Sequence, residues 1–154
     1  MLENCKTAHE RWGGTHQIID RWLGQRQATL VLYFDISTDT AANQQSDLLQ
    51  AFCESLMDYV SAGHFEVYEQ LVREAREFDD GGLDLARKLY PGVESTTRVI
   101  VDFNDKYDTQ DHSQLNASDL PADLSQLGEA MTERFEMEDQ LIERLHTIHK
   151  EQVA

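Results

Sequence analysis

The sequence has little of what builds sheets, disulfide frameworks or membrane spans. Its 154 residues include two prolines, eight glycines and two cysteines, Cys5 and Cys53. Alternating β-branched runs are nearly absent, which argues against a β-sheet, and two cysteines cannot form a disulfide framework or a zinc cluster. No apolar run reaches the roughly 18 residues that span a bilayer, and no apolar stretch of a signal peptide follows Met1. We therefore expect a helical protein of the cytoplasm.

Basic residues are also scarce. The chain has 13 Lys and Arg against 29 Asp and Glu, for a formal net charge of −16. The electrostatic field of this negative charge repels nucleic acid phosphates and anionic lipid headgroups, and it attracts basic surfaces. We therefore expect no direct binding to nucleic acid or membranes, and a basic protein surface is the partner that the charge favours.

Amphipathic helices account for most of what is present. Hydrophobic residues make up 40% of the chain, and they recur every three or four positions, as on the buried face of a helix. We predict an all-α, single-domain antiparallel helical bundle over 1–154, with a four-helix core and additional short helices. A polar segment at 1–14 and loops at 35–46 and 108–120 interrupt the pattern. Thr15 is the expected N-cap of the first long helix.

The stretch 58–69 joins two of these amphipathic runs. Its centre, Ser61-Ala62-Gly63, consists of small residues, and glycine tolerates the positive φ that ends many helices. We therefore predict that two helices meet at a bend there. Further helix ends are expected at 79–82, which reads Asp-Asp-Gly-Gly, and near Pro91, because proline disfavours helical geometry in the residue before it.

Two charged residues fall on otherwise apolar stripes. Arg26, in the first helix, is expected either to extend to the rim or to bind a carboxylate from a neighbouring helix. Glu138, in the last helix, would be costly to bury without a partner. It is expected to reach Arg134 one turn earlier, to meet an arginine of the first helix, or to face a cavity open to water.

Catalytic interpretations find little support. Di-metal four-helix bundles use two Glu-x-x-His motifs, and this chain has one, Glu143 to His146. His146 and His149 share a helix face but make a weak metal site. Phosphate-binding loops, nucleophile elbows and dinucleotide fingerprints are missing. We predict no enzyme activity, cofactor or metal, and keep a metal-carboxylate helical bundle enzyme as an alternative.

Three long strings resemble one known family. They are "DYVSAGHFEVYE" with its centre at Gly63, "GGTHQIIDRWLGQRQ" and "RFEMEDQLIERL". They resemble the Rsd/AlgQ family, the regulators of sigma D that act as anti-sigma factors. The opening "MLENC", together with "ERWGG" and "HFEVYEQL", is similar to the AlgQ branch of pseudomonads. The resemblance covers most of the chain and fades in the two predicted loops.

The resemblance implies a specific partner, the primary sigma factor of RNA polymerase. Members of that family bind free sigma, contact its −35-reading carboxy-terminal domain and compete with core polymerase and promoter DNA. The family's binding stretch implies contacts by Asp58, Phe65 and Glu69, and by His64, Arg21, Trp22, Arg134 and Asp139. An acidic helical adaptor for another basic protein is the remaining alternative, and the sequence does not reveal whether the protein self-associates.

Overall fold

The computed structural model describes residues 7–38 and 42–153 and contains no strand within them. Its elements are α1 (Ala8–Thr38), α2 (Ala42–Ala62), the π-helix η2 (Gly63–Val67), α3 (Tyr68–Phe78), α4 (Gly82–Tyr107), α5 (Gln110–Leu115), the 3₁₀-helix η3 (Ala117–Asp119), α6 (Leu120–Leu145) and the 3₁₀-helix η4 (Thr147–Gln152). The predicted all-α class is confirmed. In the described ranges no helix combines the length and the apolar character that crossing a membrane requires.

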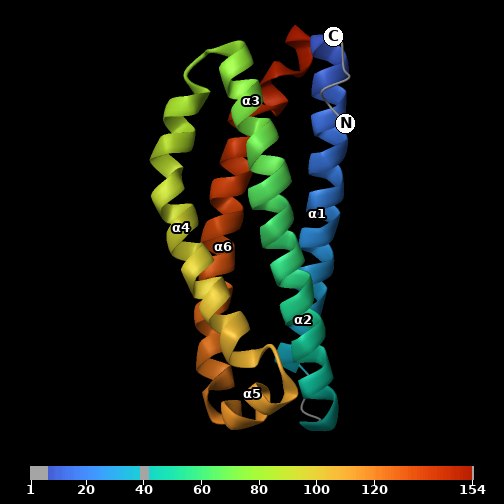
Figure 1. The fold of residues 1–154 in the computed structure, drawn as a ribbon, viewed down its shortest axis with the longest axis vertical. Coiled ribbons are helices and arrows are strands. Elements are labelled where there is room, and N and C mark those ends of the chain that lie inside the picture. Colours follow the sequence, from blue (N-terminus) through green and yellow to red (C-terminus); the bar gives the residue numbers. More distant parts are fainter. Residues whose placement is uncertain (1–6, 39–41, 154) are drawn as a thin grey trace.

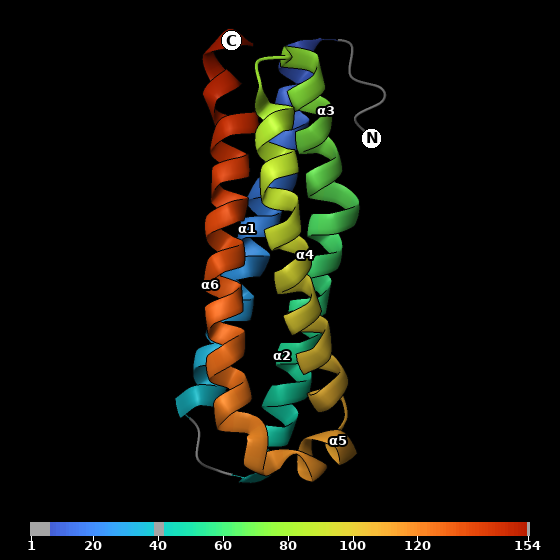
Figure 2. The same cartoon turned by 90° about the vertical axis from the view of Figure 1, so that its left-hand side faces the viewer.

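The long helices run side by side as an up-down-up-down bundle (Figure 1). One column is the continuous series α2, η2 and α3, and the others are α1, α4 and α6. α5 closes one end, and the start of α1 lies with η4 at the other (Figure 1). The view in Figure 2 places α6 on the side of the bundle opposite to α2 and α3. α1 packs closely on α2, and α4 packs closely on α6, whereas α1 and α6 make few close backbone approaches.

One apolar core runs through all four columns. Its buried side chains include Ile19 and Trp22 of α1, Phe52 and Leu56 of α2, Leu71 of α3, Ile100 and Phe103 of α4, and Leu127 and Met131 of α6. Cys53 is buried in this core, and burial raises the pKa of its thiol to about 12. The thiol is therefore an uncharged packing group.

The first helix is longer than predicted at both ends. α1 already begins at Ala8, and Thr15 is a buried residue within it rather than its N-cap. At the other end α1 continues to Thr38 and α2 starts at Ala42, so the predicted loop at 35–46 is mostly helical. These polar residues suggested a loop in the sequence. In the structure they extend helices that apolar residues in the neighbouring turns hold in place. Residues 1–6 and 39–41 of these two predicted segments lie outside the described ranges.

The predicted loop at 108–120 also contains helix. Thr109 caps α5, because its Oγ1 accepts a hydrogen bond from the backbone N–H of His112 at 3.1 Å. The amide of Asn116 then donates to the carbonyl oxygens of Lys106 (3.2 Å) and His112 (3.0 Å). These side-chain bonds satisfy backbone groups that short helices leave unpaired.

Pro91 does not end a helix, contrary to the prediction, and lies inside α4. A proline inside a helix costs one backbone hydrogen bond, about 3 kcal/mol. Packing along α6 offsets this cost: a Cβ atom at Gly92 would lie 2.6 Å from the Met137 sulfur, so the two helices approach closely beside the proline. The stop predicted at 79–82 is confirmed, since α3 ends at Phe78 and Asp79 adopts the left-handed conformation (φ 44°).

The predicted bend at Ser61-Ala62-Gly63 is wrong, because the helix continues through it. The chain widens into the π-helical turn η2, and the N–H of Tyr68 bonds to the carbonyl of Gly63. Trp22 explains the need for glycine: a Cβ at Gly63 would lie 2.9 Å from its indole ring. The same indole donates from Nε1 to the carbonyl of Tyr59 at 2.9 Å. A side chain bonded to a helical carbonyl is a known cause of such irregular turns.

We predict that Gly63→Ala lowers the free energy of unfolding by about 2 kcal/mol, because the added methyl group collides with the buried indole. Gly24→Ala is the matched control: among the described residues, no neighbouring atom would lie within 4 Å of a Cβ added there. Alanine in a helix is better than glycine by roughly 0.5–1 kcal/mol, so this control should be slightly stabilised. Urea unfolding followed by circular dichroism measures both. Stabilisation by Gly63→Ala would contradict the account of the π-helical turn.

Candidate protein-binding site

An exposed aromatic residue sits at mid-height on the α2–η2–α3 helix. Phe65 is 74% exposed, although the residues two positions before and after it, Gly63 and Val67, are buried. Asp58 lies seven positions before Phe65, and Glu69 lies four positions after it, and both are exposed. The three therefore form a stripe along one helix, in which a large ring is flanked by carboxylates.

The π-helical turn shapes this surface. It presents His64, Phe65 and Glu66 as three consecutive exposed side chains, and the His64 ring meets the Phe65 ring edge to face at 4.8 Å. Glu66 makes a 3.7 Å ion pair with Arg21 of α1. Both partners are largely exposed, so this pair contributes little stability and remains available to a partner.

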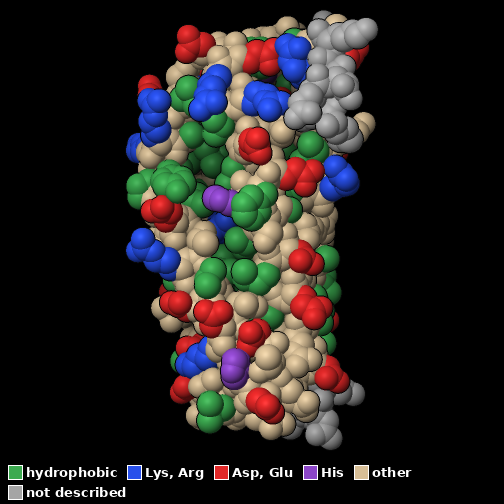
Figure 3. Space-filling model, in the orientation of Figure 1, with side chains coloured by type: hydrophobic (Ala, Val, Ile, Leu, Met, Phe, Trp, Pro, Cys, Tyr) green, Lys and Arg blue, Asp and Glu red, His purple; other side chains and the backbone are tan. Residues whose placement is uncertain are grey.

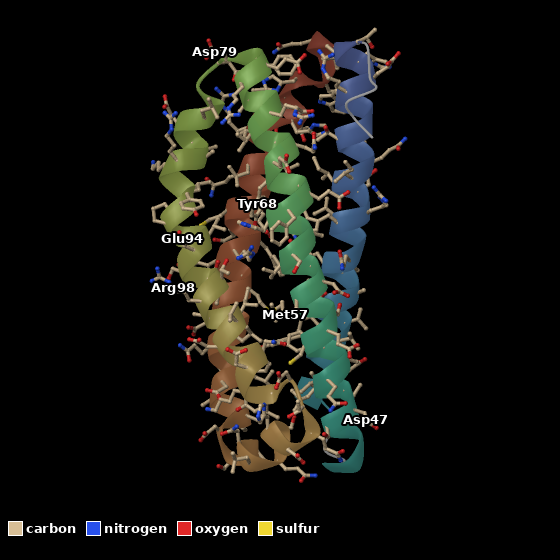
Figure 4. All side chains as sticks on the ribbon, viewed as in Figure 1. Asp47, Met57, Tyr68, Asp79, Glu94 and Arg98 are labelled. Carbon is tan, nitrogen blue, oxygen red and sulfur yellow. The ribbon has the colours of Figure 1, made fainter. Side chains whose placement is uncertain are left out.

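A hollow of about 380 Å³ lies beside Phe65, between the α2–η2–α3 helix and α4. Figure 3 shows this face, where a histidine and hydrophobic side chains gather at mid-height with acidic side chains around them. Figure 4 labels Tyr68 on one side of the hollow and Glu94 and Arg98 on α4. The lining residues are Val60, Ser61, His64, Phe65, Tyr68, Tyr90, Val93, Glu94, Thr97, Arg98 and Arg134.

The floor of the hollow belongs to a buried polar network centred on Glu138. Its carboxylate, fully buried, accepts hydrogen bonds from the hydroxyls of Tyr59 and Tyr68. It also pairs with Arg134 Nε and Arg26 Nη2, each at 3.3 Å. Two of the three arrangements predicted for Glu138 thus occur together, and Arg26 binds a neighbouring carboxylate as one of its two predicted alternatives.

Arg134 connects this network to α4. Its Nη1 donates to Thr97 Oγ1 at 2.7 Å and to Thr96 Oγ1 at 3.3 Å, and its Nη2 donates to the Tyr68 hydroxyl at 3.1 Å. Burial and the Glu138 carboxylate raise the pKa of Tyr59 and of Tyr68. Both hydroxyls therefore stay protonated at neutral pH and donate hydrogen bonds to Glu138.

We predict that Glu138→Gln lowers the free energy of unfolding by roughly 3 kcal/mol, because it leaves the buried Arg134 without its counter-charge and Arg26 with Asp139 alone. Glu136→Gln, an exposed change on the same helix, should alter it by less than about 0.5 kcal/mol. Thermal and urea unfolding measure both variants. Equal stabilities for the two would show that the network does not hold the bundle together.

A second polar cluster closes the end of the bundle where α1 begins and α6 ends. His146 Nδ1 lies 2.8 Å from Glu74 Oε2, and His149 Nε2 lies 2.8 Å from Asp80 Oδ2. The two histidines thus have separate carboxylate partners and do not converge on one point. In the described ranges no group of three or more potential metal ligands is present.

Acid should weaken the second cluster at Asp80. The hydrogen bond from His149, together with Arg144, holds the pKa of Asp80 below its ordinary value. A lowered folded-state pKa means that the interaction stabilises the fold above the ordinary pKa, about 3.9, and is lost as pH falls through the lower value. We predict that the unfolding free energy of Asp80→Asn depends less on pH between about pH 4 and 2 than that of the unmodified protein.

Asp84→Asn is the control for this pH series, because its carboxylate pairs at 3.6 Å with Arg87 on the exposed surface. Urea titrations at each pH provide the free energies. Parallel pH profiles for Asp80→Asn and the unmodified protein would contradict the assigned role of the Asp80 carboxylate.

The structure places the predicted contact residues in different environments. Trp22 and Arg134 are 2% and 1% exposed, so they support the surface from beneath, although Arg134 reaches the floor of the hollow. Asp139 is exposed in the seam between α1 and α6, where it pairs with Arg26 at 2.7 Å. The structure thus brings together Asp58, His64, Phe65, Glu69 and Arg21 near the π-helical turn and separates Asp139 from them.

Sequence reasoning missed the α4 wall of the hollow. Tyr90, Glu94 and Arg98 all line it, and Tyr90 is 55% exposed. The sequence predicted a helix end near Pro91, which assigned Tyr90 to one helix and Glu94 and Arg98 to the next. Glu94 and Arg98 are four positions apart and follow Tyr90 at helical spacing, and this periodicity across the proline was the available signal.

The fold and this surface define a class: a helical-bundle protein with an aromatic, acid-flanked site suited to a protein partner.

The chain belongs to the Rsd/AlgQ family, because the family described as "Regulator of RNA polymerase sigma(70) subunit, Rsd/AlgQ" matches residues 1–146. It is 31% identical to the "Regulator of sigma D" of Yersinia enterocolitica over 150 residues, covering 93% of this chain and 89% of the relative. It is 36% identical to that of Enterobacter sp. (strain 638) over 147 residues, covering 92% and 88%.

Proposed function

We propose that this protein is an anti-sigma factor that regulates transcription by binding the primary sigma factor of RNA polymerase. It contacts the −35-reading carboxy-terminal domain of sigma and competes with core polymerase and promoter DNA. It acts by occupying sigma rather than by catalysis, in the cytoplasm where polymerase works. Membership in the Rsd/AlgQ family supports this proposal, as do the names of the Yersinia and Enterobacter relatives.

The observation that carries the proposal at the level of residues is the exposure of Phe65 within an acidic stripe. Binding energy in protein interfaces concentrates in a few aromatic or arginine anchors that a partner encloses. Asp58 and Glu69 flank the ring, and the hollow beside it has room for a side chain of the partner. Phe65 is therefore the anchor of the proposed interface, and the hollow beside it receives a side chain of sigma.

Electrostatics favour the same partner. A domain that reads promoter DNA carries a basic surface around its recognition helix, and the chain carries a net charge of −16. Carboxylates along the α2–η2–α3 stripe take the place that phosphates occupy on DNA. Occupancy of that surface by this protein excludes promoter DNA from it.

We predict that Phe65→Ala weakens binding of the isolated sigma carboxy-terminal domain by about tenfold or more, since losing an interface anchor costs at least about 1.4 kcal/mol. Phe34→Ala removes a ring that is also largely exposed, at 60%, but lies on α1 outside the hollow. It should leave the affinity unchanged. Isothermal titration calorimetry at moderate salt measures binding, and circular dichroism verifies that each variant keeps its helicity.

Charge reversal separates the contribution of the carboxylates. Glu69→Lys should weaken sigma binding, whereas Asp105→Lys makes the same charge change at an exposed position of α4 and should have a smaller effect. Equal losses for the two would mean that overall charge, not the stripe, attracts sigma. If the unmodified protein ignores sigma and binds another basic protein instead, the adaptor function replaces the proposal.

A further inference from the structure

A second, larger concavity lies between α1 and α6. It has a volume of about 890 Å³, and its walls include Leu30, Tyr33 and Phe34 of α1 and Met131 and Phe135 of α6. No residue lines both this groove and the hollow beside Phe65. The groove is therefore a surface separate from the hollow, and of the contacts that the family resemblance implies it includes Asp139 alone.

The groove follows from how these two helices are joined. α1 and α6 make few close backbone approaches, and long side chains bridge them instead. Arg26 reaches Glu138 and Asp139, and the Tyr33 hydroxyl donates to the Leu124 carbonyl at 2.8 Å. Because side chains rather than close backbone contacts join the two helices, an open channel remains along their outer side.

Gly128 keeps the channel open at its floor. A Cβ atom there would lie 2.5 Å from the Tyr33 hydroxyl oxygen, so the Tyr33 bridge and a side chain at position 128 exclude one another. The bridge thus requires glycine, and glycine leaves the floor of the groove unfilled. The groove is a consequence of the fold's own interactions and persists in the absence of a partner.

One edge of the groove is acidic. Glu129, Glu133 and Glu136 line it from α6, are exposed and recur every three or four positions along one side of that helix. Among the residues that the structure describes, no ion pair involves these three glutamates. An apolar floor beside unpaired carboxylates matches an amphipathic segment with a basic side.

We propose that this groove docks an amphipathic, basic α-helix of a protein partner. The apolar side of that helix packs against Phe34, Leu30 and Phe135, and its Lys and Arg side chains lie along Glu129, Glu133 and Glu136. The α6 lining extends from Ser125 to Asp139, which at 1.5 Å per residue is roughly 20 Å, enough for a helix of about 14 residues. The hollow and the groove share no lining residue, so a ligand can contact either one without contacting the other.

The test uses a fluorescent peptide of about 14 residues with leucines on one helical face and lysines on the other, at about 150 mM salt to suppress long-range attraction. Fluorescence anisotropy measures its affinity for the intact protein. We expect Phe34→Ala, and separately the pair Glu133→Lys with Glu136→Lys, to weaken binding about tenfold or more. Phe65→Ala, and the pair Asp102→Lys with Asp105→Lys on α4, should change it less than about twofold.

Three results would overturn the proposal. The first is an equal loss for both lysine pairs, or equal binding of a peptide with the same composition in scrambled order, since either means attraction by net charge alone. The second is no measurable binding of the amphipathic peptide. The third is a dimer, detected by light scattering, that Phe34→Ala dissociates, because a second copy of the chain would then fill the groove.

The same variants keep this proposal separate from the anti-sigma function. Phe34→Ala should bind the sigma carboxy-terminal domain normally while losing the peptide, and Phe65→Ala should do the reverse. If the unmodified protein binds the peptide but does not bind sigma, the anti-sigma proposal is refuted and the proposed role of the groove is unaffected.

Discussion

The buried carboxylate of Glu138 is the interaction on which the rest of the structure depends. It takes hydrogen bonds from Tyr59 on α2 and Tyr68 on α3, and it pairs with Arg26 of α1 and Arg134 of its own helix. Through Thr96 and Thr97, Arg134 adds α4 to the same network. Apolar side chains tolerate small sliding of helices, whereas this set of donors matches one carboxylate in one register. The network therefore fixes how the four columns stand relative to one another.

That register determines the surface. Tyr59 stacks on Trp22 at 4.7 Å, and Trp22 in turn lies against Gly63 and bonds to the carbonyl of Tyr59. The π-helical turn starts at this contact and turns His64 and Phe65 outward. The positions of the exposed Phe65 ring and of the hollow beside it thus depend on the buried contacts around Glu138. This also explains why Trp22 and Arg134, for which the family resemblance implies partner contacts, lie beneath the surface.

Much of the fold and part of the site could be predicted from the sequence. Apolar periodicity indicated the helices, and the carboxylate on the stripe of the last helix pointed to a buried partner for Glu138. Periodicity did not predict Tyr59 and Tyr68 as that carboxylate's donors, because their hydroxyls read as ordinary core aromatics until the helices are placed. Small residues at Ser61-Ala62-Gly63 suggested a helix end, but tertiary packing of one indole against Gly63 produced a continuous helix. Pro91 similarly hid the α4 wall, since contacts with α6 outweighed its local preference.

A hydrogen-exchange footprint of the sigma carboxy-terminal domain on this protein tests the central claim most directly. The account predicts slower exchange of backbone amides over 58–69 and 90–98, the two walls of the hollow, when the domain is bound. Exchange over 30–34 of α1 and 125–139 of α6, the segments that line the groove, should be unchanged. Protection confined to α1 and α6, with 58–69 unaffected, would contradict the assignment of sigma to the surface around Phe65.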